Sequence, residues 1–306
     1  MGWEEINLAK YVAEIKRNME IEVSDEIIKK DLLLTLILAE FQKLKVGKEL
    51  IFKGGTLLSR NYLKYHRFSE DLDFVYRSSE TIRKLPRSAM ERKIKKFLDY
   101  FVPELKKVAD TLGLDFDSMR SNKRYCTIMP GKTVYIFRVY YSKEHSIKIE
   151  INFLEKIFDR PRRVSVKAIT DYFASRDLLK ILGLELENFS VLSYTLNEIT
   201  LEKYRAVLTR KLLMERDLFD LYLIPNSLKV NTKKAVKKIE NASMIKNELK
   251  THISENLRLL EEDKFFNSEE KIEVLAIIKY KPEDFRQFKE KIKPILIEIC
   301  RLFLKK

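Results

Sequence analysis

The sequence predicts an α+β protein, in which a mixed β-sheet core flanked by helices is followed by a helical C-terminal lobe. From about Lys167 onward, apolar residues recur mainly at helical spacing. Short runs typical of strands are confined to the part before it, at residues 50–53, 72–76, 124–129, 134–141 and 146–153. We therefore expect two domains. Residues 1–166 would form the sheet lobe, with N-terminal helices within 1–47, and residues 167–306 would form the helical lobe.

Local signals place the individual elements of the first lobe. Ser24 is a suitable N-cap for a helix beginning at Asp25, because its hydroxyl can accept a hydrogen bond from a free backbone N–H group. The sequence Pro130-Gly131-Lys132 is typical of a turn and joins the two strands around it. Further helices are expected at residues 56–63 and 87–112.

The basic charge of the chain is concentrated rather than spread. The formal net charge is +14, from 60 Lys and Arg against 46 Asp and Glu. Residues 51–150 carry a surplus of +9 and residues 201–250 a surplus of +6. Such blocks favour an anionic partner such as a phosphate group or RNA, and a lysine-rich solvated surface is the alternative explanation.

Several classes of protein are excluded by composition. The longest apolar run, Leu32–Ala39, is far shorter than the roughly 20 residues of a membrane span. The acidic N-terminal residues lack the apolar core of a signal peptide. Cys126 and Cys300 cannot form a disulfide framework or a zinc cluster. We expect a cytoplasmic protein that does not associate with membranes.

The most informative segment runs from residue 53 to residue 74. Gly54 and Gly55 lie at a strand-to-helix junction, where backbone N–H groups can approach a polyphosphate. Asp71 and Asp73 are two residues apart on a strand, so both side chains lie on one face. Two carboxylates about 4 Å apart repel by about 4 kcal/mol at a dielectric near 20. A divalent cation such as Mg²⁺, which prefers oxygen ligands, removes that penalty.

This segment resembles the AbiEii/AbiGii (MenT-type) toxin family of nucleotidyltransferases, in the DNA polymerase β-like superfamily. The residues that carry the resemblance are Lys-Gly-Gly-Thr at 53–56 and Arg-Phe-Ser-Glu-Asp-Leu-Asp-Phe at 67–74. The resemblance implies that Asp71 and Asp73 bind Mg²⁺ or Mn²⁺. It also implies a nucleotide-binding role for a set of residues around them, namely Lys53, Gly54, Gly55, Thr56, Arg67 and Ser69.

A nucleotidyltransferase needs a third carboxylate near the acceptor hydroxyl. Along the strand at 146–153, isoleucines alternate with polar residues, so that Glu150 faces away from the core. Glu150 is therefore the best candidate for a third catalytic residue and metal ligand. Asp159 is a weaker candidate because it lies in an arginine-rich turn.

A second segment of the family pattern lies in the expected helical lobe. Lys203, Arg210 and Asp217 are spaced seven apart, which places them on one face if the helix is continuous. Leu212 is expected on the packing side. An amphipathic surface helix explains the same spacing. The resemblance implies instead that Lys203 and Arg210 bind the triphosphate and that Asp217 orients them.

The function implied by the resemblance is metal-dependent transfer of NMP from an NTP to an RNA acceptor, with release of pyrophosphate. The biological role would be that of the toxin in a toxin–antitoxin or phage-defence system, with tRNA as the expected acceptor and a cognate antitoxin as a possible partner. Two alternatives stay open: a nucleotidyltransferase that modifies a protein hydroxyl, and a non-catalytic module that binds RNA or a partner on the same fold.

Overall fold

The structure is a computed structural model that describes residues 7–19, 22–174, 188–242, 246–267, 272 and 276–305. Its chain divides into two compact units. The first comprises residues 1–155 and 161–194, and the second comprises residues 156–160 and 195–306. None of the described helices is both long enough and apolar enough to cross a membrane.

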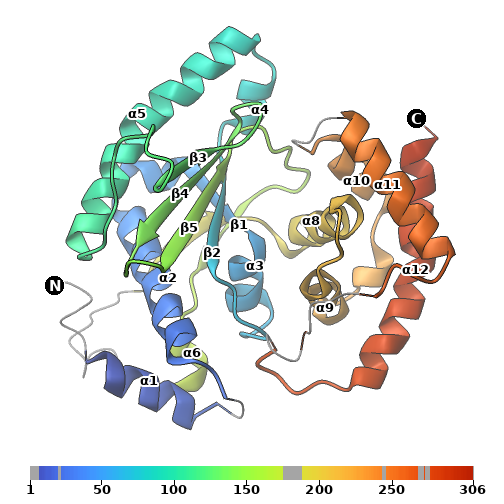
Figure 1. Ribbon diagram of the computed structural model, residues 1–306, viewed down its shortest axis with the longest axis horizontal. Coiled ribbons are helices and arrows are strands. Elements are labelled where there is room, and N and C mark those ends of the chain that lie inside the picture. The colour runs from blue at the N-terminus through green and yellow to red at the C-terminus, as the bar shows by residue number, and fades with distance from the viewer. Residues whose placement is uncertain are drawn as a thin grey trace. The chain divides into compact units, whose positions relative to one another are not determined.

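The first unit is built around a seven-stranded mixed sheet in the order β3-β4-β5-β2-β1-β7-β6. Figure 1 labels the strands β1 to β5 of this sheet. The pairs β1–β7 and β2–β5 are parallel and the other neighbours are antiparallel. This mixed arrangement confirms the predicted α+β class. The strands are β1 (Leu50–Lys53), β2 (Asp71–Tyr76), β3 (Cys126–Ile128), β4 (Val134–Tyr140), β5 (Ser146–Asn152), β6 (Arg162–Ser165) and β7 (Ser190–Ser193).

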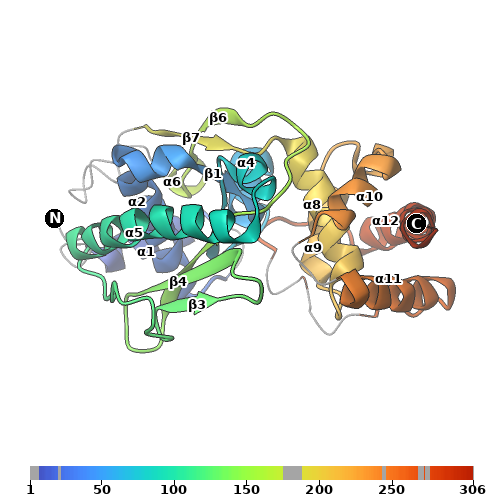
Figure 2. The ribbon, with the colours of Figure 1, turned by 90° about the horizontal axis from the view of Figure 1, so that it is seen from above.

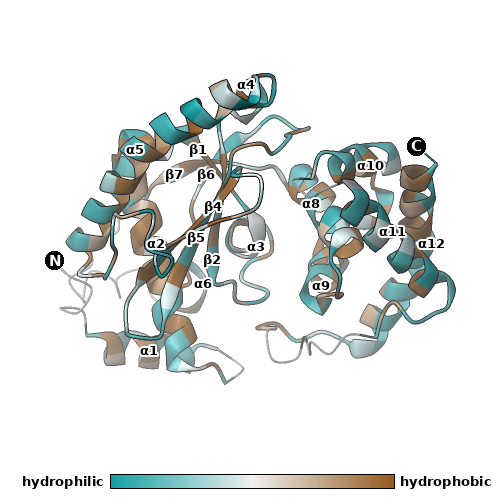
Figure 3. Cartoon of the chain, turned by 45° about the horizontal axis from the view of Figure 1, so that its top comes forward, coloured by the Kyte–Doolittle hydropathy of each residue, from teal (hydrophilic) through white to brown (hydrophobic). Residues whose placement is uncertain are grey.

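Helices of the first unit cover one face of this sheet. Phe41 of α2 lies against Phe74 of β2 and against Phe101 of α5, with ring centroids about 6 Å apart. Figure 3 shows hydrophilic residues along the outer side of α5. The predicted cap at Ser24 is present, because its hydroxyl accepts a hydrogen bond from Ile27 N. The helical segments of this unit are α1 (Leu8–Arg17), α2 (Asp25–Lys43), η2 (Lys45–Glu49), α3 (Gly54–Leu57), η3 (Leu58–Tyr62), α4 (Ser79–Arg83), α5 (Arg87–Thr111) and α6 (Thr170–Phe173).

One expectation for this part of the chain is wrong. The stretch after Lys167 was expected to be helical, yet β7 lies within it and joins the sheet. The strand is short, but Ser193 pairs with Phe52 of β1, and Val191 is fully buried. Tertiary pairing therefore decides its conformation. The predicted domain boundary followed residue 166, whereas the chain leaves the first compact unit after Tyr194, and residues 156–160 also belong to the second unit.

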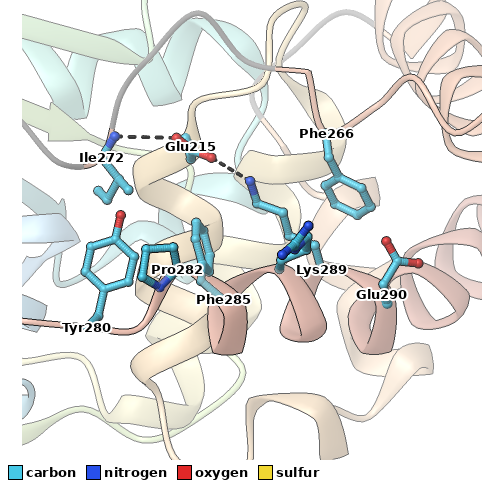
Figure 4. Close-up of a pocket in the computed structure, with 9 residues that line it drawn as sticks. Glu215, Phe266, Ile272, Tyr280, Pro282, Phe285, Lys289 and Glu290 are labelled. Carbon is cyan, nitrogen blue, oxygen red and sulfur yellow. Dashed lines mark hydrogen bonds and ion pairs between the residues drawn. The ribbon is translucent and has the colours of Figure 1, made fainter.

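The regular elements of the second unit, within its described residues, are all helical. Figure 2 shows α12 seen nearly end-on beside α11. Glu215, at the start of α9, binds Lys289 of α12 at 2.5 Å and accepts a hydrogen bond from Ile272 N (Figure 4). These contacts fix α12 against α9. The helical segments are α8 (Leu196–Thr209), α9 (Glu215–Leu223), η4 (Ser227–Lys229), α10 (Thr232–Glu240), α11 (Lys246–Glu261) and α12 (Pro282–Leu304).

Candidate active site

The central strand β2 places two carboxylates on the same face of the sheet. Leu72 and Phe74 are buried in the core, so the alternation of the strand turns Asp71 and Asp73 to the opposite face. The register places Asp73 between Lys53 of β1 and Glu150 of β5. Three predicted residues and the lysine beside them therefore gather in the middle of the sheet.

Glu150 reaches this face for the reason that the sequence predicted. Ile147, Ile149 and Ile151 are fully buried, while the side chain of Glu150 is 26% exposed. The other candidate, Asp159, belongs to the second unit, where it accepts a hydrogen bond from Thr195 Oγ1 at 2.5 Å. Within the first unit, Glu150 is thus the carboxylate that accompanies Asp71 and Asp73.

A lysine that the sequence analysis did not assign to the site lies among these acids. Lys148 Nζ is 2.9 Å from Asp71 Oδ2 and 3.8 Å from Glu150 Oε2. Burial alone would lower the pKa of Lys148, but the charges of Asp71 and Asp73 outweigh it and raise that pKa. The sequence shows that Lys148 lies two residues before Glu150 on one strand, and therefore on the same face. Only the pairing of β5 with β2 shows that Lys148 also lies opposite Asp71.

The electrostatics of the acids follow from their crowding. Burial raises the pKa of Asp73 to about 7, and the negative charge of Glu150 adds to this effect. Lys53 and Lys148 act in the opposite direction. A cation at this position would lower the free energy of the ionised state, because it neutralises carboxylates that repel one another.

The site fits a divalent metal by the type of its donor atoms. Asp71, Asp73 and Glu150 offer hard carboxylate oxygens on one face, and the ammonium of Lys148 lies where positive charge is required. Among the described residues, no three Asp, Glu, His or Cys side chains already surround one point as metal ligands. The carboxylates of Asp71 and Glu150 instead face Lys148.

The double glycine allows the chain to pass close to these acids. Gly54 has φ +80°, and a Cβ atom there would lie 2.2 Å from Asp73 Oδ2. A Cβ atom on Gly55 would lie 2.8 Å from Ser69 Oγ and 2.9 Å from Arg67 Nη2. Neither position has room for a side chain, so the turn, Asp73, Ser69 and Arg67 form one packed group.

The other predicted residues of the first segment support the loop that leads into β2. Thr56 Oγ1 lies 2.5 Å from the carbonyl oxygen of Asp71 and 3.0 Å from Ser69 Oγ. Arg67 is buried, and its Nη1 atom donates a hydrogen bond to the carbonyl oxygen of Phe68 at 2.8 Å. Lys53 is also buried. Thr56 and Arg67 thus hold the loop that presents Ser69 and Asp71.

The second predicted cluster lies within the second unit. Lys203 Nζ is 2.7 Å from Asp217 Oδ1 and 2.5 Å from Asp220 Oδ2, and both carboxylates are buried. Arg210 Nη1 is 2.9 Å from Asp217 Oδ2. The structure brings together Lys203, Arg210 and Asp217, although a continuous helix would hold Lys203 and Asp217 about 21 Å apart along its axis.

The prediction of one continuous helix through these residues is wrong. α8 ends at Thr209, and α9 begins at Glu215. The end of α8 is capped from α11, where Asn256 Nδ2 donates hydrogen bonds to the carbonyl oxygens of Leu208 and Arg210. Leu212 was expected to pack, but it lies in the connection and is 74% exposed. Because the cap comes from a distant helix, the residues around Thr209 do not themselves indicate that the helix ends there.

A second buried ion pair fixes residues 156–160 to the helical unit. Glu198 and Lys238 are fully buried and lie 2.7 Å apart. Glu198 Oε2 also accepts hydrogen bonds from the backbone N–H groups of Phe158 and Asp159. Both oxygens of this buried carboxylate are satisfied, as burial of a charge requires.

A pocket of about 310 Å³ lies elsewhere in the second unit, as Figure 4 shows. It is lined by aromatic residues, including Tyr280 and Phe285, and by the Glu215–Lys289 pair. None of the residues predicted for the site lines this pocket.

Comparison with known proteins identifies a family and a fold. The family model described as "Nucleotidyl transferase AbiEii toxin, Type IV TA system" matches residues 36–298. The solved structure of MenT4, nucleotidyltransferase toxin Rv2826c from Mycobacterium tuberculosis H37Rv, is similar, with a TM-score of 0.51 and 14% sequence identity. The match covers 95% of this chain and 98% of that chain.

A further solved structure is a more distant match. It is a STING-associated CdnE c-di-GMP synthase from Capnocytophaga granulosa, with a TM-score of 0.24 and 13% sequence identity. That match covers 98% of this chain and 86% of that chain. No curated protein sequence matches the chain.

Proposed function

This chain belongs to the AbiEii family of nucleotidyltransferase toxins of type IV toxin–antitoxin systems, and from that premise we propose that it transfers NMP from an NTP to RNA. Pyrophosphate is the leaving group. The acceptor of first choice is the 3′ end of tRNA, and the partner that the family implies is a cognate antitoxin. The observation that supports this function is that Asp71, Asp73 and Glu150 lie together on one face of the sheet.

Asp71, Asp73 and Glu150 are the residues that would hold Mg²⁺ or Mn²⁺. When bound, the metal would supply the positive charge that stabilises the attacking and leaving oxygens. Asp71 and Asp73 project from a central strand whose alternate residues are buried, and this holds both carboxylates in fixed directions. Glu150 is the group beside which the acceptor hydroxyl would lie and lose its proton.

The turn at Gly54 and Gly55 is proposed to receive the phosphates of the NTP. The two glycines carry no side chain of their own, and the hydroxyl of Ser69 and the guanidinium of Arg67 lie beside the turn. These groups offer hydrogen-bond donors to phosphate oxygens. Lys53 and Thr56 complete the proposed nucleotide-binding group of this unit.

We propose, as the family resemblance implies, that Lys203 and Arg210 bind the triphosphate and that Asp217 orients them. Lys203 is already shared between Asp217 and Asp220, so its charge is held in place and its ammonium is positioned before any ligand binds. Asp217 would orient both Lys203 and Arg210. This part of the proposal is tested kinetically, as described below.

The test of the proposed function is incubation with each of the four NTPs, labelled at the α-phosphate, and with total RNA or total protein. Label in RNA, located at 3′ ends by sequencing, supports the proposal. Label in protein would favour transfer to a protein hydroxyl. No label in either fraction, with Mg²⁺ or Mn²⁺ present, would favour a non-catalytic binding module.

A further inference from the structure

The face of the sheet that carries the acids continues across β5, β4 and β3 with a distinct set of side chains. The register places Asp71, Lys148 and Arg138 in one row on neighbouring strands. Arg138 N in turn donates a hydrogen bond to Tyr125 O at 2.9 Å, so the row extends to the start of β3. Alternate residues such as Phe137 are buried on the opposite face.

Cations and aromatic rings lie side by side around the end of this row at β4 and β3. The guanidinium of Arg124 lies over the ring of Tyr140, 4.1 Å from its centroid, and 5.6 Å from that of Tyr125. The two tyrosine rings meet edge to face at 5.5 Å. Arg138 Nη1 donates a hydrogen bond to Thr127 Oγ1 at 2.8 Å. We call Arg124, Tyr125, Arg138 and Tyr140 the strip.

The arginines of the strip are not paired with carboxylates among the described residues. Asp115 accepts a hydrogen bond from the hydroxyl of Tyr125 at 2.7 Å. Within the part of the chain that the structure describes, neither Arg124 nor Arg138 forms an ion pair. Both guanidinium groups therefore keep their charge for an external anion.

A second group of exposed cations in this unit lies on the opposite side of the sheet. On α5, Arg92, Lys93, Lys95 and Lys96 are exposed, and none of these four forms an ion pair among the described residues. The inner side of α5 packs on the core face, where Phe101 and Phe137 lie 5.2 Å apart. Since Phe137 and Arg138 point to opposite faces, α5 is separated from the strip by the sheet.

We infer that the strip is the surface on which the terminal nucleotides of a single-stranded RNA acceptor lie as its end approaches Asp71, Asp73 and Glu150. The inference rests on the proposed function. Arg124 and Arg138 contact phosphates, and the rings of Tyr140 and Tyr125 stack with bases, the combination that single-stranded nucleic acids require. From β2 to β3 the row spans three strand spacings, or roughly 14 Å.

The test measures binding of a 5′-labelled, unstructured oligoribonucleotide to the full chain by fluorescence anisotropy, over a range of salt concentrations. Arg124→Gln should lower the log–log salt slope by about 0.7, the value for one phosphate contact on a single strand. Tyr140→Ala should weaken binding roughly five- to 150-fold, since one stacked base contributes that much. Tyr140→Phe keeps the ring and should bind as the wild type does.

Lys95→Gln and Lys96→Gln are the matched controls, because each removes one exposed positive charge on the other side of the sheet. Thermal unfolding of every variant shows that it is folded. If Arg124→Gln and Tyr140→Ala bind RNA as the wild type does and the α5 variants bind it more weakly, the strip is not the RNA-binding surface. The proposed transfer to RNA would still stand. A wild-type chain that neither binds nor labels RNA would instead overturn the proposed function, and the strip with it.

Discussion

The ammonium of Lys148 lies 2.9 Å from the Oδ2 atom of Asp71, on the strand next to the two aspartates. It is also 3.8 Å from Glu150, so one lysine faces two of the three acids. The acids thus have an internal counter-charge, and the free energy of their mutual repulsion is lowered before any ligand binds. A metal ion at the same carboxylates would compete with this lysine.

Lys148→Gln should therefore raise the affinity of the protein for Mn²⁺, because the competing positive charge is removed. In the absence of metal the same variant should be less stable at pH 8, since the acids then repel one another without compensation. Calorimetric titration with Mn²⁺ and thermal unfolding measure the two effects. An unchanged or weaker affinity for Mn²⁺ would show that Lys148 does not compete with metal.

The pKa of Asp73 predicts how stability depends on pH. Because the folded-state pKa is about 7 and the ordinary value is 3.8, the folded state binds the proton more tightly than the unfolded state. Stability without metal should then fall as the pH rises from about 4 to about 7. Asp73→Asn removes this dependence, and should stabilise the protein at pH 8 by at most about 4 kcal/mol. Equal stabilisation at pH 4 and pH 8, measured by thermal unfolding, would contradict the assignment.

Gly54→Ala should abolish transfer, because the new Cβ atom would lie 2.2 Å from Asp73 Oδ2 and displace that carboxylate. Gly113→Ala is the matched control. Gly113 also has a positive φ, +67°, but nothing lies within 4 Å of its added Cβ atom. The control should lose about 1–2 kcal/mol of stability from backbone strain and keep its activity. If both variants lost activity equally, the loss in Gly54→Ala would be due to backbone strain and not to displacement of Asp73.

Lys203→Ala should lower kcat/KM roughly ten- to hundred-fold if Lys203 contacts the triphosphate, since such a contact contributes about 1.5–3 kcal/mol. A rise in KM indicates binding in the ground state, whereas a fall in kcat indicates a contact made as charge develops on pyrophosphate. Asp217→Asn should show part of the same defect. The double variant should be less than additive if the two residues act as one unit.

Lys238→Ala is the control for this experiment. Lys238, like Lys203, is a buried lysine paired with a carboxylate in the second unit, so either substitution removes a positive charge from a buried acid. Each should lose about 3–5 kcal/mol of stability. Kinetics are then compared at a temperature where both variants are folded. Wild-type kinetics for Lys203→Ala would leave Lys203 with a structural role only.

Local patterns were sufficient to predict the arrangement of the acids. Alternation along β2 and β5 determined that Asp71, Asp73 and Glu150 face away from the core, and the structure places them there. The same kind of signal predicted the cap at Ser24. These features depend on neighbours within a few residues, which a sequence displays directly.

The features that were missed depend on contacts distant in sequence. Lys148 belongs to the site because β5 pairs in parallel with β2, and the register between strands is not written in either strand alone. The break after Thr209 depends on Asn256, which lies 46 residues beyond Arg210. Charge totals misled in part, because Lys203 and Lys238 in the second basic block are buried against acids.

The most direct test of the account compares the wild type with Asp71→Asn and Asp73→Asn in transfer of α-labelled NMP to RNA. The wild type should label RNA 3′ ends with Mg²⁺ or Mn²⁺ and should lose this activity in excess EDTA. Both variants should stay folded, since loss of one acid relieves repulsion, and should transfer no label. Full transfer by either folded variant, or in EDTA, would contradict the central claim that these aspartates hold a catalytic metal.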